Sequence, residues 1–565
     1  MTTAPSGTDV PDTPALRKAR GAFFTPAELC RYAVEWAVRD AGDAVLEPSC
    51  GEAAFLTAAA ERLTALGGGG TPLHGVELHA ASAREARRRV AVTGHRARVQ
   101  VADFLALEPK PAYDAVVGNP PYVRYQDFSG EARARGREAA LRAGVNLTRL
   151  ASSWAAFTVH SALFLRPGGR LALVLPAELL SVNYAAEVRG FLMRRFGRVR
   201  LVLFTERVFP GVLEEVVLLL AEGDGGTDHC ELLQVQDVAA LGSPSGAVST
   251  WSPRSVGAKW TSALLPERSL AVYSAALADP ATVTLHTWGE TTLGAVTGNN
   301  AWFTMSPAAA EARGLREGTD VVRLSPPGSR HLRRLSLTGP DWRRLGRLGR
   351  ATLLFRPPGQ PSPAARAVIA EGEALGVPRA YKCRVRSPWW RVPVVPPADL
   401  LLTYMNADTP RLVANSAGVR HLNSVHGVYL RGGLGALGAT LPVAALNSLT
   451  LLGAEVVGRA YGGGMLKLEP READELPVPS PALVRSVRGE LAAIRDVVDE
   501  ALGAGRLLDA VRAVDDVLLV GGLGLAREDV AVLADAREVL AGRRSARSGG
   551  RAAGRAVGRA VGRAP

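Results

Sequence analysis

Short apolar runs alternate with segments of helical periodicity through the first part of the chain. Apolar runs between turn signals are typical of buried strands, and apolar residues spaced three and four apart indicate helices. The pattern predicts strands at residues 44–46, 73–76, 97–101, 113–118, 170–175, 199–204 and 215–221 and helices at residues 27–39, 80–90, 153–165 and 185–196. Thr25 is expected to cap the first helix, with Pro26 in its first turn. This alternation predicts an α/β fold in which helices cover both faces of one mainly parallel, Rossmann-like sheet.

The character of the chain changes at the glycine-rich residues 223–227. Beyond them the apolar runs are short and prolines are frequent, until amphipathic periodicity returns at residues 480–540. A chain of 565 residues is also too long for one hydrophobic core. We therefore expect a disordered N-terminus (1–20), an α/β domain (21–225), a mixed α+β domain (226–480), a helical region (481–540) and a disordered basic tail (541–565).

Positive charge is in modest excess. Lysine and arginine exceed aspartate and glutamate by 67 to 54, which gives a formal net charge of +13. Seven arginines lie in the acid-free C-terminal tail, so the rest of the chain is only mildly basic. This bias is compatible with a polyanionic partner but does not identify one.

Cysteine usage and hydropathy indicate the compartment. The four cysteines form no C-x-x-C pair, so neither a zinc site nor a disulfide framework is expected. The first residues lack the apolar core of a signal peptide, and no apolar stretch reaches the length of a membrane span. We expect a cytoplasmic protein without a membrane segment or a metal site.

Two consecutive prolines follow the predicted strand at residues 113–118, within the sequence Asn119-Pro120-Pro121-Tyr122. Neither proline can donate a ladder hydrogen bond, so the chain must leave the sheet as a stiff turn at the carboxyl end of the strand. Ligands bind at that edge of open α/β sheets. An amide side chain, fixed carbonyls and an aromatic ring would there surround a flat ring with an amino group. The alternative is a strand-ending loop whose tyrosine covers the core.

Acidic residues, Glu47, Glu77 and Asp103, follow the first three strands. Glu47 leads through the small residues 49–51 into an alanine-rich helix, which suits a nucleotide-like ligand at a helix N-terminus. Glu77 is placed for a ribose diol, Asp103 for an exocyclic amino group and Phe104 for one face of a purine. The glycines do not form the dinucleotide pattern G-x-G-x-x-G, which disfavours NAD and FAD. Each acid alone could equally cap the end of its strand.

Arginine and aromatic residues cluster in the second predicted domain, at residues 298–303, 330–350 and 381–391. Such clusters suit phosphates and bases, and a solvated face over an aromatic mini-core is an equally good interpretation. Polar residues able to read base edges lie nearby: Asn406, Asn415, Asn423 and His426.

The chain resembles the gamma-class N6-adenine DNA methyltransferases of restriction-modification systems, in the TaqI-like layout. The resemblance spans residues 21–479 and rests on six elements in order: Phe23-Phe24-Thr25-Pro26, Glu47-Pro48-Ser49-Cys50-Gly51, Gly75-Val76-Glu77, Ala102-Asp103-Phe104, Gly118-Asn119-Pro120-Pro121-Tyr122 and Val208-Phe209-Pro210. It implies a class I S-adenosylmethionine-dependent methyltransferase domain followed by a target-recognition domain. The sequence departs from the family at Ala53, where a second glycine is usual.

The resemblance implies a role for each matching residue. Thr25, Glu47 and Ser49 would line the methionine end of S-adenosylmethionine, in a loop that includes Gly51. Glu77 would hold the ribose, and Asp103 with Phe104 would hold the adenine. Asn119 and the Pro120 carbonyl would accept hydrogen bonds from the amino group of the target adenine, while Tyr122 and Phe209 would stack on that flipped base.

The implied function is methylation of adenine N6 in double-stranded DNA by a monomer. The protein would be the modification part of a restriction-modification or related defence system, with a separate cognate restriction endonuclease. The alternative is an amino-group methyltransferase for rRNA guanine or a protein glutamine, although such enzymes generally lack a long basic-aromatic domain. A fused nuclease and a catalytically silent DNA-binding module are further alternatives. The sequence shows no nuclease constellation, and residues 119–122 argue against a silent module.

Overall fold

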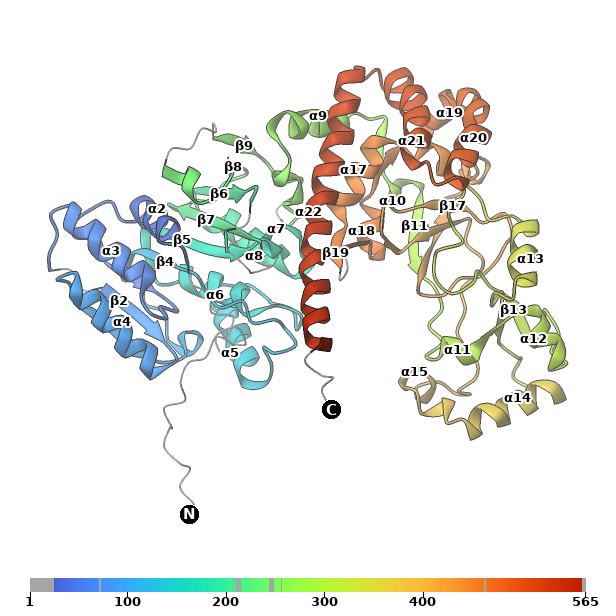
Figure 1. Ribbon diagram of the computed structural model, residues 1–565, viewed down its shortest axis with the longest axis horizontal. Helices are drawn as coiled ribbons and strands as arrows, with labels where there is room; N and C mark the ends of the chain where they lie inside the picture. Colours follow the sequence, from blue (N-terminus) through green and yellow to red (C-terminus); the bar gives the residue numbers. More distant parts are fainter. Residues whose placement is uncertain are drawn as a thin grey trace, which may run out of the picture. The chain divides into compact units, whose positions relative to one another are not determined.

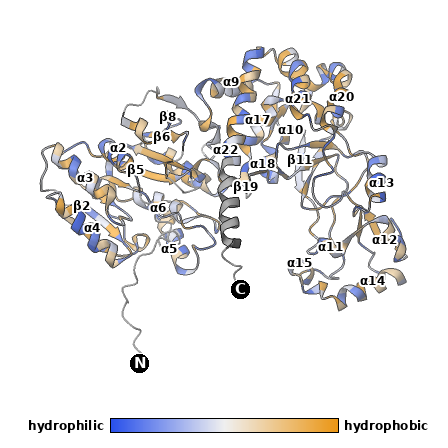
Figure 2. Cartoon of the chain, viewed as in Figure 1, coloured by the Kyte–Doolittle hydropathy of each residue, from blue (hydrophilic) through white to orange (hydrophobic). Residues whose placement is uncertain are grey.

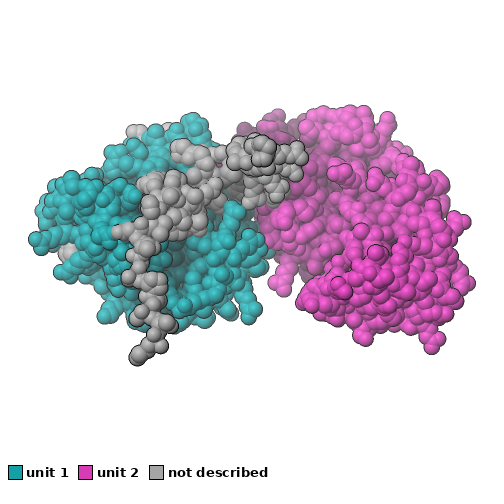
Figure 3. All heavy atoms as spheres, turned by 60° about the horizontal axis from the view of Figure 1, so that its bottom comes forward, with its two compact units in different colours: residues 1–264 teal, residues 265–565 magenta. Residues whose placement is uncertain are grey.

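The computed structural model describes residues 25–70, 73–206, 208–209, 215–242, 248–255, 257–461 and 464–560, with side chains up to residue 545. The chain forms two compact units, Met1–Leu264 and Leu265–Pro565 (Figure 3). Phe23, Phe24 and Pro210 of the motifs above lie outside the described residues. Within the described part of the chain, no helix has the length and hydropathy of a membrane span.

Unit 1 is built on one large sheet, whose described strands follow the order β3-β2-β1-β4-β5-β7-β6-β8-β9. The strands are β1 (Val45–Glu47), β2 (Leu73–Glu77), β3 (Ala97–Val101), β4 (Tyr113–Gly118), β5 (Leu165–Pro176), β6 (Arg198–Phe204), β7 (Val216–Glu222), β8 (Cys230–Val235) and β9 (Ser249–Trp251). Strands β1 to β5 pair in parallel, and β7 runs antiparallel between β5 and β6. The order reverses between β1 and β4, and such a switch point is where open α/β sheets bind ligands.

Helices cover both faces of this sheet (Figure 1). They are α2 (Ala27–Ala37), α3 (Ala54–Ala65), α4 (Ala80–Val92), α5 (Gly130–Leu141), α6 (Ser153–Ala162), α7 (Glu178–Ser181) and α8 (Ala186–Arg195), with 3-10 turns η1 (Phe104–Ala106), η2 (Asn183–Ala185), η3 (Ala239–Gly242) and η4 (Thr261–Leu264). Strand β5 shows how side chains sort: Ala172 and Val174 join the core beneath α2 and α3, whereas the alternate residues Leu171 and Leu173 are buried on the other face. Figure 2 shows these strands as mainly hydrophobic and α4 as largely hydrophilic. The predicted α/β fold is confirmed.

The sheet continues past the point where the sequence pattern predicts its end. Strand β8 pairs in parallel with β6, and β9 pairs with β8, so unit 1 extends beyond residue 225. The glycines at residues 223, 225 and 226 have φ values of 73°, 100° and 77°, which allows a tight reversal between strands. A glycine-rich turn and a glycine-rich linker have the same composition, so the sequence alone could not separate them.

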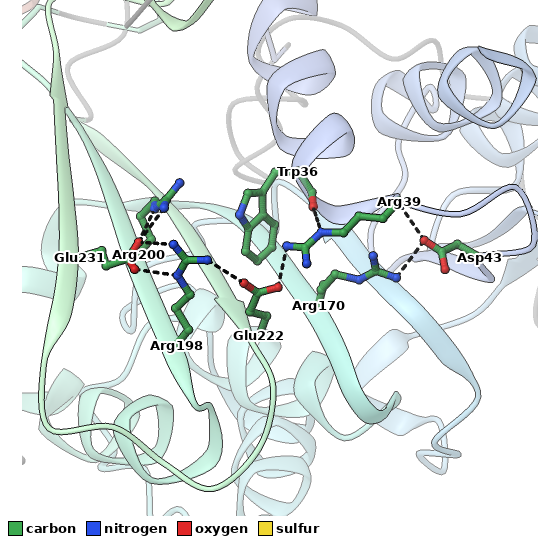
Figure 4. Close-up of polar contacts among 8 residues, drawn as sticks. All are labelled: Trp36, Arg39, Asp43, Arg170, Arg198, Arg200, Glu222 and Glu231. Carbon is green, nitrogen blue, oxygen red and sulfur yellow. Dashed lines mark hydrogen bonds and ion pairs between the residues drawn. The ribbon is translucent and has the colours of Figure 1, made fainter. Parts of the chain in front are cut away.

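Ion pairs join the edge of the sheet where β5, β6 and β8 begin (Figure 4). Arg170 pairs with Asp43 at 2.8 Å. Glu222 pairs with Arg39 and Arg198, and Glu231 pairs with Arg198 and Arg200. Each of these acids therefore has an arginine partner, and pairs of this kind fasten strand ends with modest stabilisation.

Unit 2 contains small sheets in the orders β10-β21, β11-β18-β15-β17, β12-β14-β13 and β16-β20-β19. The strands are β10 (Thr282–Thr284), β11 (Gly289–Leu293), β12 (Thr304–Met305), β13 (Val321–Arg323), β14 (Leu353–Phe355), β15 (Leu400–Thr403), β16 (Met405–Asn406), β17 (Leu412–Ala414), β18 (Val425–Leu430), β19 (Arg459–Tyr461), β20 (Met465–Lys467) and β21 (Pro477–Pro479). This is the expected mixed α+β organisation.

Helices form the remainder of unit 2. They are α9 (Glu267–Ala278), α10 (Leu285–Trp288), α11 (Asn300–Phe303), α12 (Pro307–Ala312), α13 (Gly339–Arg347), α14 (Pro363–Ala374), α15 (Tyr381–Arg384), α16 (Leu441–Ala444), α17 (Ser448–Val457), α18 (Pro470–Asp474), α19 (Pro481–Ser486), α20 (Arg488–Gly503), α21 (Leu507–Asp515) and α22 (Arg527–Ala560). The 3-10 turns η5 (Val377–Arg379) and η6 (Gly435–Leu437) and the π-helical η7 (Asp516–Gly522) complete the unit.

The last helix, α22, occupies residues 541–560, which the sequence pattern assigns to a disordered tail. Arg544 is 4% exposed and pairs with Glu455 of α17, with Nη2 2.8 Å from Oε1 and Nε 3.0 Å from Oε2. A buried charge pair fixes its partners in one geometry. Low-complexity composition does not reveal such a contact, which is why the helix was not predicted.

Candidate active site

A cavity of about 470 Å³ opens at the carboxyl ends of β1 to β4. All the residues predicted to bind a cofactor line it, together with Asn119, one of the predicted catalytic residues: Thr25, Glu47, Ser49, Gly51, Glu77, Asp103, Phe104 and Asn119. The position is the topological switch point of the sheet. Residues from five separate segments of the sequence are therefore brought to one place by the strand order.

Glu47 lies at the bottom of the cavity, where it is 3% exposed. Its Oε2 accepts a hydrogen bond from the Leu56 amide of α3 at 3.1 Å. Burial raises the pKa of the Glu47 carboxyl well above its usual range, and the nearby Glu77 raises it further, while the backbone amides of Leu56 and Phe55 oppose the shift. Glu47 is thus a buried acid held by a helix N-terminus, with no basic partner among the described residues.

Glu77 connects two loops at the cavity wall. Its Oε2 accepts from the Gly51 amide at 2.9 Å, and its Oε1 accepts from the His79 amide at 2.9 Å. The Cys50 amide in turn donates to the Val76 carbonyl at 3.0 Å. The loop after β1 is therefore tied to the end of β2.

Ala53, the position where the resembled family has glycine, adopts φ 66° and ψ 41° at the start of α3. This left-handed conformation costs a residue with a Cβ about 1–2 kcal/mol. The loop therefore keeps a glycine-like backbone although it has an alanine side chain.

Asp103 and Phe104, which follow β3, make more contacts within the protein than the sequence suggests. Asp103 Oδ1 accepts from the Leu105 amide at 3.0 Å and caps η1, and its Oδ2 pairs with Arg135 Nη1 at 3.0 Å. Phe104 is 2% exposed and stacks on Phe157 with ring centroids 5.5 Å apart. Both residues border the cavity, and Phe104 does so as part of an aromatic wall.

Asn119 presents an unsatisfied acceptor. Its Nδ2 donates to Thr25 Oγ1 at 3.1 Å, whereas its buried Oδ1 has no hydrogen-bond partner within the described part of the chain. An unpaired buried acceptor costs about 1–3 kcal/mol, and because Asn119 lines the cavity, its Oδ1 could be satisfied by a ligand that donates to it. Thr25 was expected to cap the first helix; this prediction is wrong, because α2 begins after Pro26 without a side-chain cap. The Thr25 hydroxyl orients Asn119 instead.

The other predicted catalytic residues lie beside the cavity rather than in its lining. Tyr122 packs against the main core, and its hydroxyl donates to the Val174 carbonyl of β5 at 2.9 Å. Phe209 is 3% exposed within the same core. Pro120 is buried. The structure therefore brings Tyr122 and Phe209 into one core region and keeps both rings packed.

Sequence reasoning missed several residues of the cavity. Arg135, which does not line the cavity but pairs with Asp103 at its wall, lies on α5 in an arginine-rich stretch without a distinguishing signal. Ser153 and Phe157 lie on the first two turns of α6 and line the cavity. The paired serines that begin this helix were a visible signal of a helix start. Among the described residues, no cluster of histidine, cysteine and acidic side chains is arranged to hold a metal ion.

The polar residues expected to read base edges in unit 2 are mostly internal. Asn406 bonds to Thr403, and Asn415 bonds to the carbonyls of Ala398 and Val419. His426 is fully buried, with Nε2 2.8 Å from the Leu468 carbonyl. Only Asn423 of this set is exposed. Asn406, Asn415 and His426 instead bond to backbone groups of short strands and loops. The prediction that these three side chains read base edges is therefore wrong.

The aromatic residues of unit 2 also serve its core. Trp302 lies 5.1 Å from Trp389 and 5.4 Å from Phe355, centroid to centroid. Basic and aromatic side chains around residues 381–385 remain exposed on α15. The aromatic mini-core is therefore present, and the phosphate-binding interpretation stays a prediction for the exposed residues.

Comparison with known proteins agrees with this architecture. Residues 13–224 match the family model of the N-6 DNA Methylase, and residues 257–519 match that of the C-terminal domain of the Type II methyltransferase M.Eco57I. The chain is 26% identical over 479 residues to the Type II methyltransferase M.XamI of Xanthomonas campestris pv. amaranthicola, covering 81% of this chain and 85% of that protein. It is 33% identical over 219 residues to M.TthHB8I of Thermus thermophilus, covering 37% and 46%.

A solved structure extends the likeness of fold to both units. The type IIL restriction-modification enzyme MmeI, determined in complex with DNA, matches with a TM-score of 0.54 at 12% identity and covers 94% of this chain and 80% of that chain. The strands β1 to β7 and the cavity at the switch point of the sheet lie within the segment that matches the N-6 DNA Methylase model. With its N-6 DNA methylase domain and its M.Eco57I-type C-terminal domain, the chain belongs to the DNA methyltransferases of restriction-modification systems.

Proposed function

We propose that this protein transfers a methyl group from S-adenosylmethionine to the N6 amino group of a flipped-out adenine in double-stranded DNA, as a gamma-class enzyme. The observation that carries the proposal is the buried, unpartnered Oδ1 of Asn119 at the rim of the cavity. An exocyclic amino group is the natural donor for such an atom.

The residues around the cavity fit S-adenosylmethionine. A volume of about 470 Å³ is within the range of small-molecule sites, and the donor and acceptor set suits each part of the molecule. Glu47 and Ser49 would hold the methionine end, Glu77 the ribose, and Asp103 the adenine. When bound, S-adenosylmethionine supplies a methyl carbon activated by a sulfonium.

Asn119 would act on the target amino group. Its Oδ1 and the Pro120 carbonyl would each accept one amino hydrogen and draw both out of the ring plane. The nitrogen lone pair, otherwise delocalised into the purine, would then be localised as a nucleophile. The Thr25 hydroxyl keeps the Asn119 amide in the orientation that this needs. Fixed dipoles of this kind need no reorganisation at the moment of reaction.

Tyr122 and Phe209 would stabilise the extruded base. Flipping a base costs a few kcal/mol, and stacking on an aromatic ring returns about 1–3 kcal/mol. Phe209 is packed in the core, so its stacking would require the residues around it to rearrange on DNA binding. Tyr122 is already held in place, because its hydroxyl donates to the Val174 carbonyl of β5.

The wider role follows from the family. Unit 2 would recognise the target sequence, and the protein would act as a monomer that protects sites from a separate cognate restriction endonuclease. The M.Eco57I-type domain over most of unit 2 supports this division of labour.

The proposal predicts the effect of Asn119→Ala. Removal of one preorganised acceptor should lower the single-turnover rate of methyl transfer to duplex DNA by about 100- to 1000-fold, with DNA binding retained. The rate is measured with labelled S-adenosylmethionine and unmethylated bacterial genomic DNA. Asn146→Ala changes an exposed asparagine of the same unit and should behave as wild type. Turnover that survives Asn119→Ala would remove Asn119 from the mechanism.

A further inference from the structure

Ser153, in the first turn of helix α6, makes three hydrogen bonds to the backbone of Pro121 and Val123, on either side of Tyr122. Ser153 is 2% exposed. Its Oγ accepts from the Val123 amide at 2.9 Å and donates to the Pro121 carbonyl, and its amide donates to the Val123 carbonyl at 3.0 Å. The single hydroxyl hydrogen of Ser153 is thus used by the Pro121 carbonyl, and one lone pair of its oxygen is used by the Val123 amide.

These bonds enclose Tyr122. The Pro121 carbonyl belongs to the peptide before Tyr122, and the Val123 amide belongs to the peptide after it. One side chain therefore fixes both peptide planes that determine where the ring points. The tyrosine hydroxyl is held separately, at the Val174 carbonyl of β5. Tyr122 is anchored at its backbone by α6 and at its far end by the sheet.

The first turn of helix α6, which carries Ser153, is itself held in place by hydrogen bonds. Trp154 is fully buried, and its Nε1 donates to Tyr184 Oη at 3.1 Å. Tyr184 donates to Glu178 Oε2 at 2.6 Å, and its Oη lies 3.1 Å from Ser152 Oγ. Burial and the adjacent Glu178 raise the pKa of Tyr184, so the hydroxyl remains a donor. The neighbours of Ser153 hold α6 against the segment after β5, which makes it a firm support.

We propose that Ser153 is a positioning residue for methyl transfer: it acts through the Pro121 and Val123 backbone to hold Tyr122 and the adjoining Asn119–Pro120 acceptors in their working geometry. The proposal rests on the function proposed above. Misplacement of a reacting arrangement by about 1 Å can cost about 100-fold in rate.

The test compares Ser153→Ala with Ser152→Ala in the full-length protein. Both serines are buried and adjacent, but Ser152 Oγ contacts Tyr184 and not the turn. We expect Ser153→Ala to lower the single-turnover rate on genomic DNA by about 10- to 100-fold, with the Kd for S-adenosylmethionine changed less than about threefold. Ser152→Ala should stay within about threefold of wild type in both measurements, because Tyr184 keeps its hydrogen bonds to Trp154 and Glu178 without Ser152. Ser153→Thr retains the hydroxyl and should recover most of the rate; Ser153→Cys, similar in size and weakly bonding, replaces the alanine variant if that variant does not fold.

Hydrogen exchange gives a readout that does not depend on activity. The Val123 amide should exchange faster in Ser153→Ala than in wild type and be unchanged in Ser152→Ala. A Ser153→Ala rate equal to wild type, an equal loss in Ser152→Ala, or a loss of S-adenosylmethionine affinity in proportion to the rate would each overturn the positioning role. If the wild-type protein transfers no label to DNA while the exchange pattern holds, the proposed function fails and the structural support by Ser153 stands.

Discussion

At the scale of single residues, the candidate site contains groups that would be costly anywhere else in the molecule. Within the part of the chain that the structure describes, Asn119 keeps an unpaired buried acceptor and Glu47 keeps a buried carboxyl without a basic partner. The acids Glu222 and Glu231, at the other edge of the sheet, are paired with arginines. Residues that lower stability and lack an internal partner are typical of functional sites.

Glu47→Gln separates stability from function. Burial raises the pKa of Glu47, so its favourable contribution to stability is present at low pH and is lost as pH rises through the folded-state pKa. At neutral pH the neutral glutamine should therefore give equal or higher stability, because it avoids a buried charge and its oxygen can still accept from Leu56. Its affinity for S-adenosylmethionine should fall by about 10-fold or more, the equivalent of one charge-assisted hydrogen bond.

Urea unfolding and calorimetric titration of Glu47→Gln provide these two values. Glu231→Gln is the matched control, since it removes an acid with two arginine partners and should lower stability without changing cofactor affinity. A Glu47→Gln variant that is less stable and binds the cofactor normally would contradict the assignment.

The chemical identity of the site residues could be predicted from the sequence, but their partners could not. Glu77 and Asp103 were placed correctly at strand ends because a sheet brings its carboxyl ends together. The Asp103–Arg135 pair and the Asn119–Thr25 bond join residues far apart in the chain, and no local spacing encodes such contacts.

At the scale of elements, the loop after β1 depends on a glycine in the neighbouring strand. A Cβ on Gly75 of β2 would lie 2.9 Å from Cys50 Sγ and 3.0 Å from Leu56 Cδ1. Both distances are too short for ordinary contact, and the interior is close-packed. Only a residue without a Cβ therefore leaves room at this position of β2 for the loop after β1 and for α3.

Gly75→Ala should displace this loop. We expect a loss of stability of about 1–3 kcal/mol, as for other overpacked cores, and a several-fold weaker affinity for S-adenosylmethionine. Chemical denaturation and calorimetry measure the two effects. Gly69→Ala changes a glycine with no atom near the added methyl group, and it should alter neither. Unchanged affinity in Gly75→Ala would show that the loop does not need this close approach.

Strand and helix positions in unit 1 followed from periodicity, because buried strands and amphipathic helices leave strong patterns. The two additional strands β8 and β9 and the extent of α22 did not. Their presence depends on pairing partners distant in sequence, in particular β6 and Glu455.

At the scale of the whole molecule, both units bury neutral histidines. Burial lowers the pKa of His160 in unit 1 to about 4, and likewise those of His331 and His421 in unit 2. His421 is completely buried, and neither ring nitrogen has a partner within the described residues. Each of these histidines therefore stays neutral in the folded protein at neutral pH, and its protonation favours unfolding.

Stability should therefore fall as pH decreases from about 6.5 towards 4. The unfolded chain takes up protons in that window whereas the folded histidines resist them, and a shift of this size corresponds to roughly 3 kcal/mol per group. His421→Phe removes one titrating ring of similar size and should flatten the pH dependence of the urea midpoint. An identical slope in His421→Phe would show that His421 does not titrate as described.

The identity of the methylated base tests the proposed function most directly. Unmethylated duplex DNA is incubated with the full-length protein and labelled S-adenosylmethionine, then digested to nucleosides and separated by mass spectrometry. The Asn119 acceptor and the surrounding cavity predict label in N6-methyl-2′-deoxyadenosine, formed about 100- to 1000-fold more slowly with Asn119→Ala. Label in a methylated cytosine, or only in RNA or protein offered in parallel, would contradict it.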